Sequence, residues 1–195
     1  MKHIKIYTLW LMLLAAVTAT AQENNKFYVG DVSGMLSLPV DLPFYVENTS
    51  DGIVALQADV YMPEGMTLRT SESYVTYDKI RLADHRVSVT SLNTSEYGPR
   101  AYRVIMLSGT NRPVSANRGM LFAVQATIAD DAPMTTGQSY PIEVRNVVLS
   151  DVNGDNLVTE YDGGSVTIAP SPDFTISNPR IVAVEGGSEV SNIDP

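Results

Sequence analysis

The sequence predicts an all-β protein, a β-sandwich or jelly roll, and three observations support this fold class. Apolar residues alternate with polar ones in five separate runs, which is typical of strands that are buried on one face. Clusters of Gly, Pro, Asn, Asp and Ser separate these runs and predict turns. No stretch keeps apolar residues at the i, i+3, i+4, i+7 spacing of a helix. One-sided strands bury their apolar faces against another sheet, so we expect a sandwich.

The N-terminal segment, residues 1–21, has the features of a cleaved secretory signal peptide. Lys2 and Lys5 precede an apolar run from Ile6 to Val17, and Ala19-Thr20-Ala21 matches the small-x-small cleavage pattern. The apolar run is shorter than the about 20 residues that a membrane span needs. We therefore predict export to the cell surface or medium, with the periplasm as an alternative, and no membrane insertion after cleavage.

The predicted strands follow the leader in order. The longest alternating run extends from Leu36 to Glu47, where Pro39 and Pro43 indicate an edge strand or a bulge because proline cannot donate a ladder hydrogen bond. In this run Leu36, Leu38, Val40, Leu42, Phe44 and Val46 are expected to face the core. Further alternating runs are Ile53–Met62, Met120–Ile128, Tyr140–Val144 and Val166–Ile168, and shorter strands are expected at 27–32, 73–82, 86–92 and 100–108.

The last part of the chain changes character after Ala169. Pro170-Ser171-Pro172 breaks the alternation, and a single candidate strand, Arg180 to Val184, precedes Gly186 and Gly187. We therefore predict one domain over residues 22–169 and a linker or C-terminal tail over 170–195.

Composition excludes several kinds of function. The chain has no cysteine, which excludes disulfides, thiol catalysis, cysteine-based metal sites and a lipid-modified N-terminal cysteine. Its formal charge is −9, and it becomes −11 when Lys2 and Lys5 leave with the leader. Such acidity argues against partners that are nucleic acids or anionic membrane surfaces, since both attract basic proteins.

Four motifs resemble, in order, those of cohesin domains. They are Asp51–Gly65, Gly119–Val124, Tyr140–Asp151 and Gly163–Ile168, and the resemblance covers about residues 27–168. The variant looks closest to cohesin-like modules of Bacteroidales surface proteins. The resemblance implies a nine-stranded jelly-roll β-sandwich, related to a class of carbohydrate-binding modules. Cohesins bind dockerins through one sheet face, but no residue of that face can be matched to this sequence individually.

The sequence has few of the residues and motifs that commonly act in catalysis. His85 is the single histidine after the leader, and it lies between two predicted strands, where an exposed turn is expected. No Gly-x-Ser-x-Gly motif accompanies it, and a zinc site would need more His or Cys ligands than the chain has. We therefore predict that the protein is not an enzyme.

One segment, residues 151–162, matches the spacing of a calcium loop. Asp151, Asn153 and Asp155 occupy positions 1, 3 and 5, and Asp162 is a carboxylate at position 12, as in EF-hands and dockerins. Position 6 is Asn156 instead of glycine. The favoured alternative is a strand connection in which Asp and Asn side chains bind their own backbone. No cofactor is required, and a weak calcium site is the second expectation.

The tyrosines offer a candidate sugar platform. Tyr45 and Tyr61 lie on predicted polar faces, and Tyr74 and Tyr77 cluster, whereas Trp10, the only tryptophan, belongs to the leader. The favoured alternative is that these tyrosines cover strand surfaces. The leading hypothesis is thus an extracellular module that docks a protein partner of the dockerin type, with a polysaccharide-binding module or a structural spacer as alternatives.

Overall fold

The computed structural model of the chain describes residues 24–49, 52–116, 118–171, 183–185 and 188–190. The predicted signal peptide, residues 1–21, lies outside these ranges. Within them the regular secondary structure is almost entirely strand, and the helices are two single turns, η1 (Glu72–Tyr74) and α2 (Thr94–Tyr97). The all-β prediction is confirmed.

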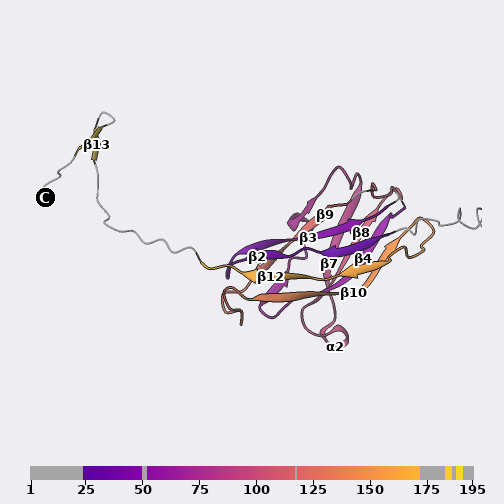
Figure 1. The fold of residues 1–195 in the computed structure, drawn as a ribbon, viewed down its shortest axis with the longest axis horizontal. Helices are drawn as coiled ribbons and strands as arrows, with labels where there is room; N and C mark the ends of the chain where they lie inside the picture. The colour runs from indigo at the N-terminus through magenta and orange to yellow at the C-terminus, as the bar shows by residue number, and fades with distance from the viewer. Residues whose placement is uncertain (1–23, 50–51, 117, 172–182, 186–187, 191–195) are drawn as a thin grey trace, which may run out of the picture.

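Two six-stranded sheets form the sandwich (Figure 1). Sheet one has the order β11-β1-β3-β9-β5, and β6 also pairs with β9. Its strands are β1 (Lys26–Val29), β3 (Pro39–Glu47), β5 (Met66–Leu68), β6 (Val75–Tyr77), β9 (Met120–Ile128) and β11 (Glu160–Asp162). Sheet two has the order β2-β12-β10-β4-β8-β7. Its strands are β2 (Val32–Gly34), β4 (Ala55–Tyr61), β7 (His85–Ser91), β8 (Ala101–Ser108), β10 (Ser139–Ser150) and β12 (Gly164–Ile168).

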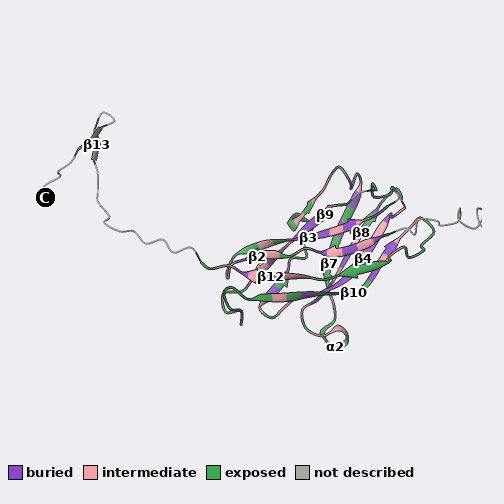
Figure 2. Cartoon of the chain, viewed as in Figure 1, coloured by how far each residue is buried: buried purple, intermediate pink, exposed green. Residues whose placement is uncertain are grey.

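The core lies between the two sheets and draws on both. Phe44 and Phe122 of sheet one stack with ring centroids 4.9 Å apart, and Leu56 and Val104 face them from sheet two, all at most 2% exposed. Along β4 the predicted inward set is confirmed, since Val54, Leu56, Ala58, Val60 and Met62 are all buried. Figure 2 shows the resulting alternation of buried and more exposed residues along the strands.

The start of β3 differs from the predicted alternation. Leu38 was expected to face the core, but 45% of its surface is exposed. A turn precedes the strand here, because Ser37 has a positive φ of 66° and the Leu38 amide donates to the Met35 carbonyl at 3.2 Å. The alternating pattern therefore begins only with the strand, at Pro39. The register against β9 shifts between Phe44 and Tyr45, but the extra residue is Leu121 of β9, so the bulge is not in β3. The edge alternative fits instead, because β1 pairs only with Phe44–Glu47 and leaves the run from Pro39 to Pro43 paired with β9 alone.

The chain crosses from sheet one to sheet two twice, between β1 and β2 near its start and between β11 and β12 near the end of the sandwich, and the two crossings are neighbours. β1 pairs in parallel with β11 in sheet one, and β2 pairs in parallel with β12 in sheet two. The chain crosses between the sheets at Gly30 and again at Gly163. This corner is closely packed, since a Cβ atom on Gly30 would lie 2.8 Å from both Pro43 Cγ and Tyr45 Cε2. The nine-strand count stays a prediction, because several of these strands are only three residues long.

The C-terminal segment contains a short antiparallel pair, β13 (Ala183–Glu185) and β14 (Ser188–Val190). The strand expected at 180–184 overlaps β13 at two residues, and its first three residues lie outside the described ranges. The domain boundary at 169 and the linker or tail over 170–195 stay predictions. In the described part of the chain, no helix has the length and apolar character needed to cross a bilayer.

Candidate functional site

The outer face of sheet two carries an apolar strip formed by residues of β8 and β10. Inward-pointing Leu56, Ala58 and Val60 on β4 leave the odd-numbered residues of that strand on the outside. In register across the sheet, Ile105 of β8 pairs with Gln57, which pairs with Val148 of β10. Leu107, at the next outward position of β8, is 48% exposed. We call this outer face of β10, β4, β8 and β7 the docking face.

A buried carboxylate sits in the middle of this face. Asp59 is on the outward side of β4 but has no exposed surface. Arg103 Nε and Nη2 of the neighbouring strand donate to its two oxygens at 2.7 and 2.9 Å, and Asn146 Nδ2 of β10 donates to Oδ2 at 2.8 Å. Both oxygens are thus paired, and Asp59 holds three strands of the docking face together.

A bulge in β10 brings Asn146 into this network. The register of β10 against β4 shifts between Arg145 and Val148, and Asn146 has a φ of 51°. Asparagine accepts this left-handed backbone conformation better than most residues. After the bulge Val147 and Leu149 point to the core, whereas before it Val144 does. The bulge therefore resets which side chains of β10 reach the docking face.

The charges of this network stabilise one another. Burial alone would raise the pKa of Asp59, but hydrogen bonds from Arg103 and Asn146 outweigh it and hold the pKa below its usual value. The hydrogen bonds that Arg103 donates to Asp59 in turn raise the pKa of Arg103. Asp59 and Arg103 are therefore both ionised throughout the physiological pH range. Each oxygen of the buried Asp59 carboxylate accepts at least one hydrogen bond, which offsets the cost of its burial.

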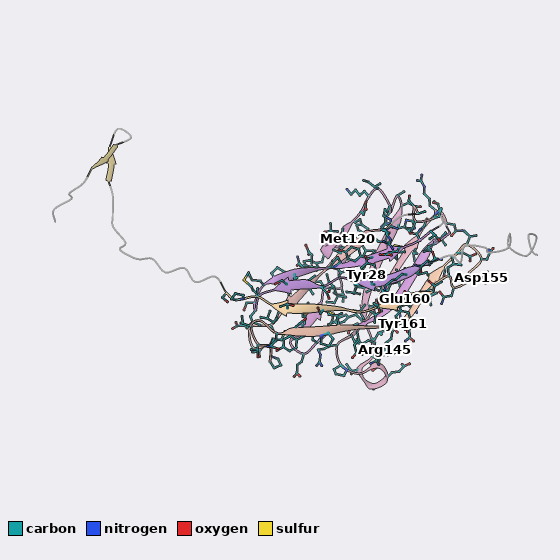
Figure 3. The ribbon with its side chains drawn as sticks, in the orientation of Figure 1. Tyr28, Met120, Arg145, Asp155, Glu160 and Tyr161 are labelled. Carbon is teal, nitrogen blue, oxygen red and sulfur yellow. The ribbon has the colours of Figure 1, made fainter. Side chains whose placement is uncertain are left out.

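A shallow groove borders the docking face at the ends of β4 and β10. It has a volume of about 380 Å³, and its walls include Tyr61, Tyr97 and Pro141. The Arg145 guanidinium lies over the Tyr61 ring at 4.4 Å and pairs with Glu143 at 2.7 Å. Figure 3 places Arg145 low in the view, on the α2 side of the sandwich. This end of the face thus combines aromatic rings with oriented arginines, which is a frequent composition of protein interfaces.

The four tyrosines of the candidate sugar platform lie in different places. Tyr45 is on sheet one and stacks on Tyr28, whereas Tyr61 is on sheet two. Tyr74 ends η1 with the Arg69 guanidinium 5.1 Å from its ring centroid. Tyr77 is partly buried, and its hydroxyl accepts a hydrogen bond from the Val87 amide at 3.1 Å. Each ring has its own protein contact, and the structure does not gather the four on one surface.

The candidate calcium residues form a hydrogen-bonded turn. Asp151 Oδ1 accepts from the amides of Asn153 and Asp155 at 2.8 and 2.9 Å, and its Oδ2 accepts from Asn153 Nδ2 at 2.9 Å. Asp162 is apart from this turn, on β11, where it pairs with Lys26. Three of the four residues therefore come together. Among the described residues no group of three or more His, Asp or Glu side chains has metal-binding geometry. Calcium binding stays a prediction.

His85 differs from its prediction as an exposed turn residue. It is the first residue of β7, and its side chain is completely buried. Val87 and Val89 on the same side of the strand are also buried, so the alternation of β7 places His85 inward. Neither ring nitrogen has a hydrogen bond of good geometry among the described residues, although the backbone of Arg112 lies close enough to favour the protonated ring. Asp84 Oδ1 is 3.9 Å from Nδ1, and burial lowers the pKa of His85 more than this carboxylate raises it.

The sequence did not identify the network around Asp59. Asp59 occupies a predicted polar face, and its partners Arg103 and Asn146 are 44 and 87 residues away along the chain. The pairing of β4 with β8 brings Asp59 opposite Arg103, and that pairing cannot be read from local alternation. The available signal was the presence of two opposite charges, Asp59 and Arg103, on two segments that were each predicted to be strands.

The comparisons with known proteins agree on the fold. CaCohA2 from Clostridium acetobutylicum has a TM-score of 0.59 at 20% identity, covering 77% of this chain and 94% of that one. A type I cohesin–dockerin complex from Clostridium thermocellum, Coh-OlpA-Doc918, gives 0.58 at 14% identity over 74% and 99%. A non-cellulosomal cohesin from Archaeoglobus fulgidus gives 0.56 at 13% identity over 75% and 92%. No family model and no curated protein matches the chain.

The similarity extends over nearly the whole length of these solved modules. Because the sequence identities are low, this structural similarity establishes the fold of the chain and does not identify its binding partner. The Bacteroidales origin stays a prediction. The domain has a cohesin-like fold, a jelly-roll β-sandwich of the kind that the motif resemblance implied.

Proposed function

We propose that this protein is a non-catalytic extracellular module that docks a protein partner of the dockerin type through the docking face. Solved structures of the same fold include cohesin–dockerin complexes, which supports a protein as the partner. The predicted leader at residues 1–21 supports export. His85, the sole histidine after the leader, is buried inside the sandwich, which supports a role other than general base catalysis.

The observation that carries this proposal is the apolar strip of the docking face. Leu107 is 48% exposed on a regular strand, and half-buried Ile105 and Val148 continue the strip. Arg86, Ser88 and Thr90 flank it on β7, and Arg145 flanks it on β10. An apolar centre with a polar rim is the usual anatomy of a protein interface.

The Asp59 network joins the strands beneath this surface. Because Arg103 is held by two hydrogen bonds and Asn146 by one, the three strands beneath the strip are joined by side chains as well as by their ladders. A partner that binds a surface already in place loses less conformational entropy than one that binds a mobile loop. The face therefore supports a docking mode that uses the sheet as a preformed platform.

The test is capture of a partner by the purified chain with residues 170–195 in place. Secreted proteins of the host organism are passed over the immobilised chain, and bound proteins are identified by mass spectrometry and then measured by calorimetry. We expect a dockerin-bearing protein to bind, and Leu107→Glu to weaken its binding at least about tenfold, since a charge would enter a desolvated apolar contact.

Ile80→Glu is the matched control, because Ile80 is an apolar residue 89% exposed in a loop outside the docking face. It makes the same change of charge and is expected to leave binding unchanged. Equal binding by the wild type and Leu107→Glu would exclude this face. A partner without a dockerin would retain the protein-docking role and reject the dockerin-type partner.

A further inference from the structure

We propose that a hollow on the outer face of sheet one, opposite the docking face, binds a saccharide. The hollow is open to solvent, has a volume of about 490 Å³, and is lined by residues of β1 and β11 with the end of β3. Tyr28 and Glu160, which Figure 3 labels, come from two of these strands and line it. The inference is independent of the proposed protein docking, because the two sites have no residue in common.

The hollow lies beside the corner where the chain changes sheets. Gly30 and Gly163 are among its lining residues, and both lie at the crossing points. A side chain at Gly30 would collide with Pro43 and Tyr45, and one at Gly163 would collide with the backbone of Ile142. Close packing at this corner therefore requires glycine at both positions, and it fixes the backbone that passes beside Tyr28.

Tyr28 supplies a braced aromatic wall. Its ring stacks on that of Tyr45 with centroids 4.8 Å apart and planes 3° from parallel. Tyr28 lines the hollow and Tyr45 does not, so Tyr45 supports the ring from the other side. The C–H groups of a pyranose ring carry partial positive charge, and they pack well on the negative face of an aromatic ring. A fixed ring makes this contact without losing rotamer freedom.

Polar groups of both kinds surround this wall. Lys26 donates to Glu160 and Asp162 across the floor, at 2.8 and 2.5 Å, and Arg118 pairs with Glu47 at 2.9 Å. Asp31 also lines the hollow, and its Oδ1 accepts from Ser165 Oγ at 2.8 Å. Sugar hydroxyls both donate and accept hydrogen bonds, so they match a site that alternates carboxylates with cations.

The charge balance selects a neutral saccharide over a charged one. Four carboxylates line the hollow, those of Asp31, Glu47, Glu160 and Asp162, against the cations of Lys26 and Arg118. An anionic sugar would meet an excess of negative charge. Lys26 and Arg118 are both held in ion pairs with carboxylates of the hollow. The site therefore offers a saccharide hydrogen-bonding groups in fixed positions and little attraction for a net charge.

The experiment is a glycan array with the purified chain, followed by calorimetry with the oligosaccharide that binds best. We expect a neutral oligosaccharide to bind, Tyr28→Ala to weaken it at least about tenfold, and Tyr28→Phe to retain it within about threefold, since the ring carries the contact. Tyr74→Ala is the matched control, because Tyr74 is a 39%-exposed tyrosine away from the hollow, and it is expected to bind like the wild type.

A second variant separates loss of the site from loss of the fold. Tyr28→Leu retains an apolar side chain on β1 without a flat ring, and its melting curve shows whether the domain is folded. A folded Tyr28→Leu protein that has lost the oligosaccharide supports the proposal. No neutral glycan on the array, or equal binding by the wild type and Tyr28→Leu, would overturn it. Preference for a sulfated or carboxylated glycan would overturn the charge argument and with it the proposal.

Discussion

Two polar residues of sheet two, Asp59 and His85, are both completely buried, yet their surroundings are opposite. Asp59 has a hydrogen bond to each oxygen from Arg103 and a third from Asn146. His85 has none to either ring nitrogen within the described chain. Burial alone therefore says little about what a polar residue does to stability. The partners decide it, because the cost of removing a group from water is recovered only when its hydrogen bonds are remade.

The largest expected effect follows from removing the satisfied group. Asp59→Ala leaves the Arg103 guanidinium without its carboxylate, and we expect the free energy of unfolding to fall by about 3–5 kcal/mol. Chemical denaturation followed by circular dichroism measures this loss. Asp41→Ala, at an exposed position of β3, is the control and should stay within about 0.5 kcal/mol of the wild type. A loss below about 1 kcal/mol for Asp59→Ala would contradict the importance of the network.

The bulge residue is expected to matter less than the carboxylate. Asn146→Ala removes one hydrogen bond to a charged group and places alanine at a φ of 51°, so we expect a loss of about 2–3 kcal/mol. Asn146→Gly removes the same hydrogen bond but accepts the left-handed backbone, and it should be about 1 kcal/mol less harmful. Denaturation of the two variants side by side separates the bond from the backbone strain, and equal losses would mean that strain is absent.

Replacing the buried, unpaired His85 is expected to increase the free energy of unfolding, whereas replacing Asp59 decreases it. His85→Leu removes two buried nitrogens that lack partners and retains an apolar side chain beside Val87, so the free energy of unfolding at pH 7 should rise by about 1 kcal/mol. The same denaturation experiment measures it. His85→Asn, which retains unpaired polar atoms, is the control and should bring no gain. A decrease for His85→Leu would show that the ring has an unrecognised partner.

The pH dependence of stability separates the same two residues. Burial holds the pKa of His85 below 6.5, so the unfolded chain binds the proton first, and stability should fall as pH drops below about 6.5. Asp59 also has a lowered pKa, but its loss begins only below about pH 4, where the unfolded carboxyl takes up a proton. Melting temperatures measured from pH 8 to pH 3 should fall first below about pH 6.5 and again below about pH 4, and the first fall, the upper step, should be absent in His85→Leu. An unchanged upper step would assign it to another group.

The smallest effect is expected at an exposed polar turn. Asp151 accepts its three hydrogen bonds from neighbours at most four residues away, so Asp151→Ala should shift the melting temperature by under about 3 °C. Because these bonds already occupy the carboxylate, we expect about 5 mM calcium, enough to saturate most extracellular sites, to leave the melting temperature of the wild type unchanged. A rise that disappears in Asp151→Ala would establish the calcium site instead.

Local alternation predicted most of the architecture. The inward residues of β4 and the apolar positions of β9 from Phe122 to Ile128 are buried as expected. The prediction failed at Leu38 and, in β10, extended only to Val144, and both results have local causes. At Leu38 a turn with a positive φ at Ser37 delays the strand, and in β10 the bulge at Asn146 shifts the alternation between Val144 and Val147. Both are single-residue events, and one inserted residue reverses the face of every side chain that follows.

The sequence by itself determined the fold class, the approximate strands and the poverty of reactive groups, because side-chain period and composition are local properties. Tertiary structure alone decided which polar residues are buried with partners, how Arg103 and Arg145 are presented beside the apolar strip, and where the Tyr28 hollow lies. These features depend on strand pairing between residues up to 134 apart, as between Lys26 and Glu160. Such pairing is fixed by the packing of two whole sheets, and no local stretch of sequence contains it.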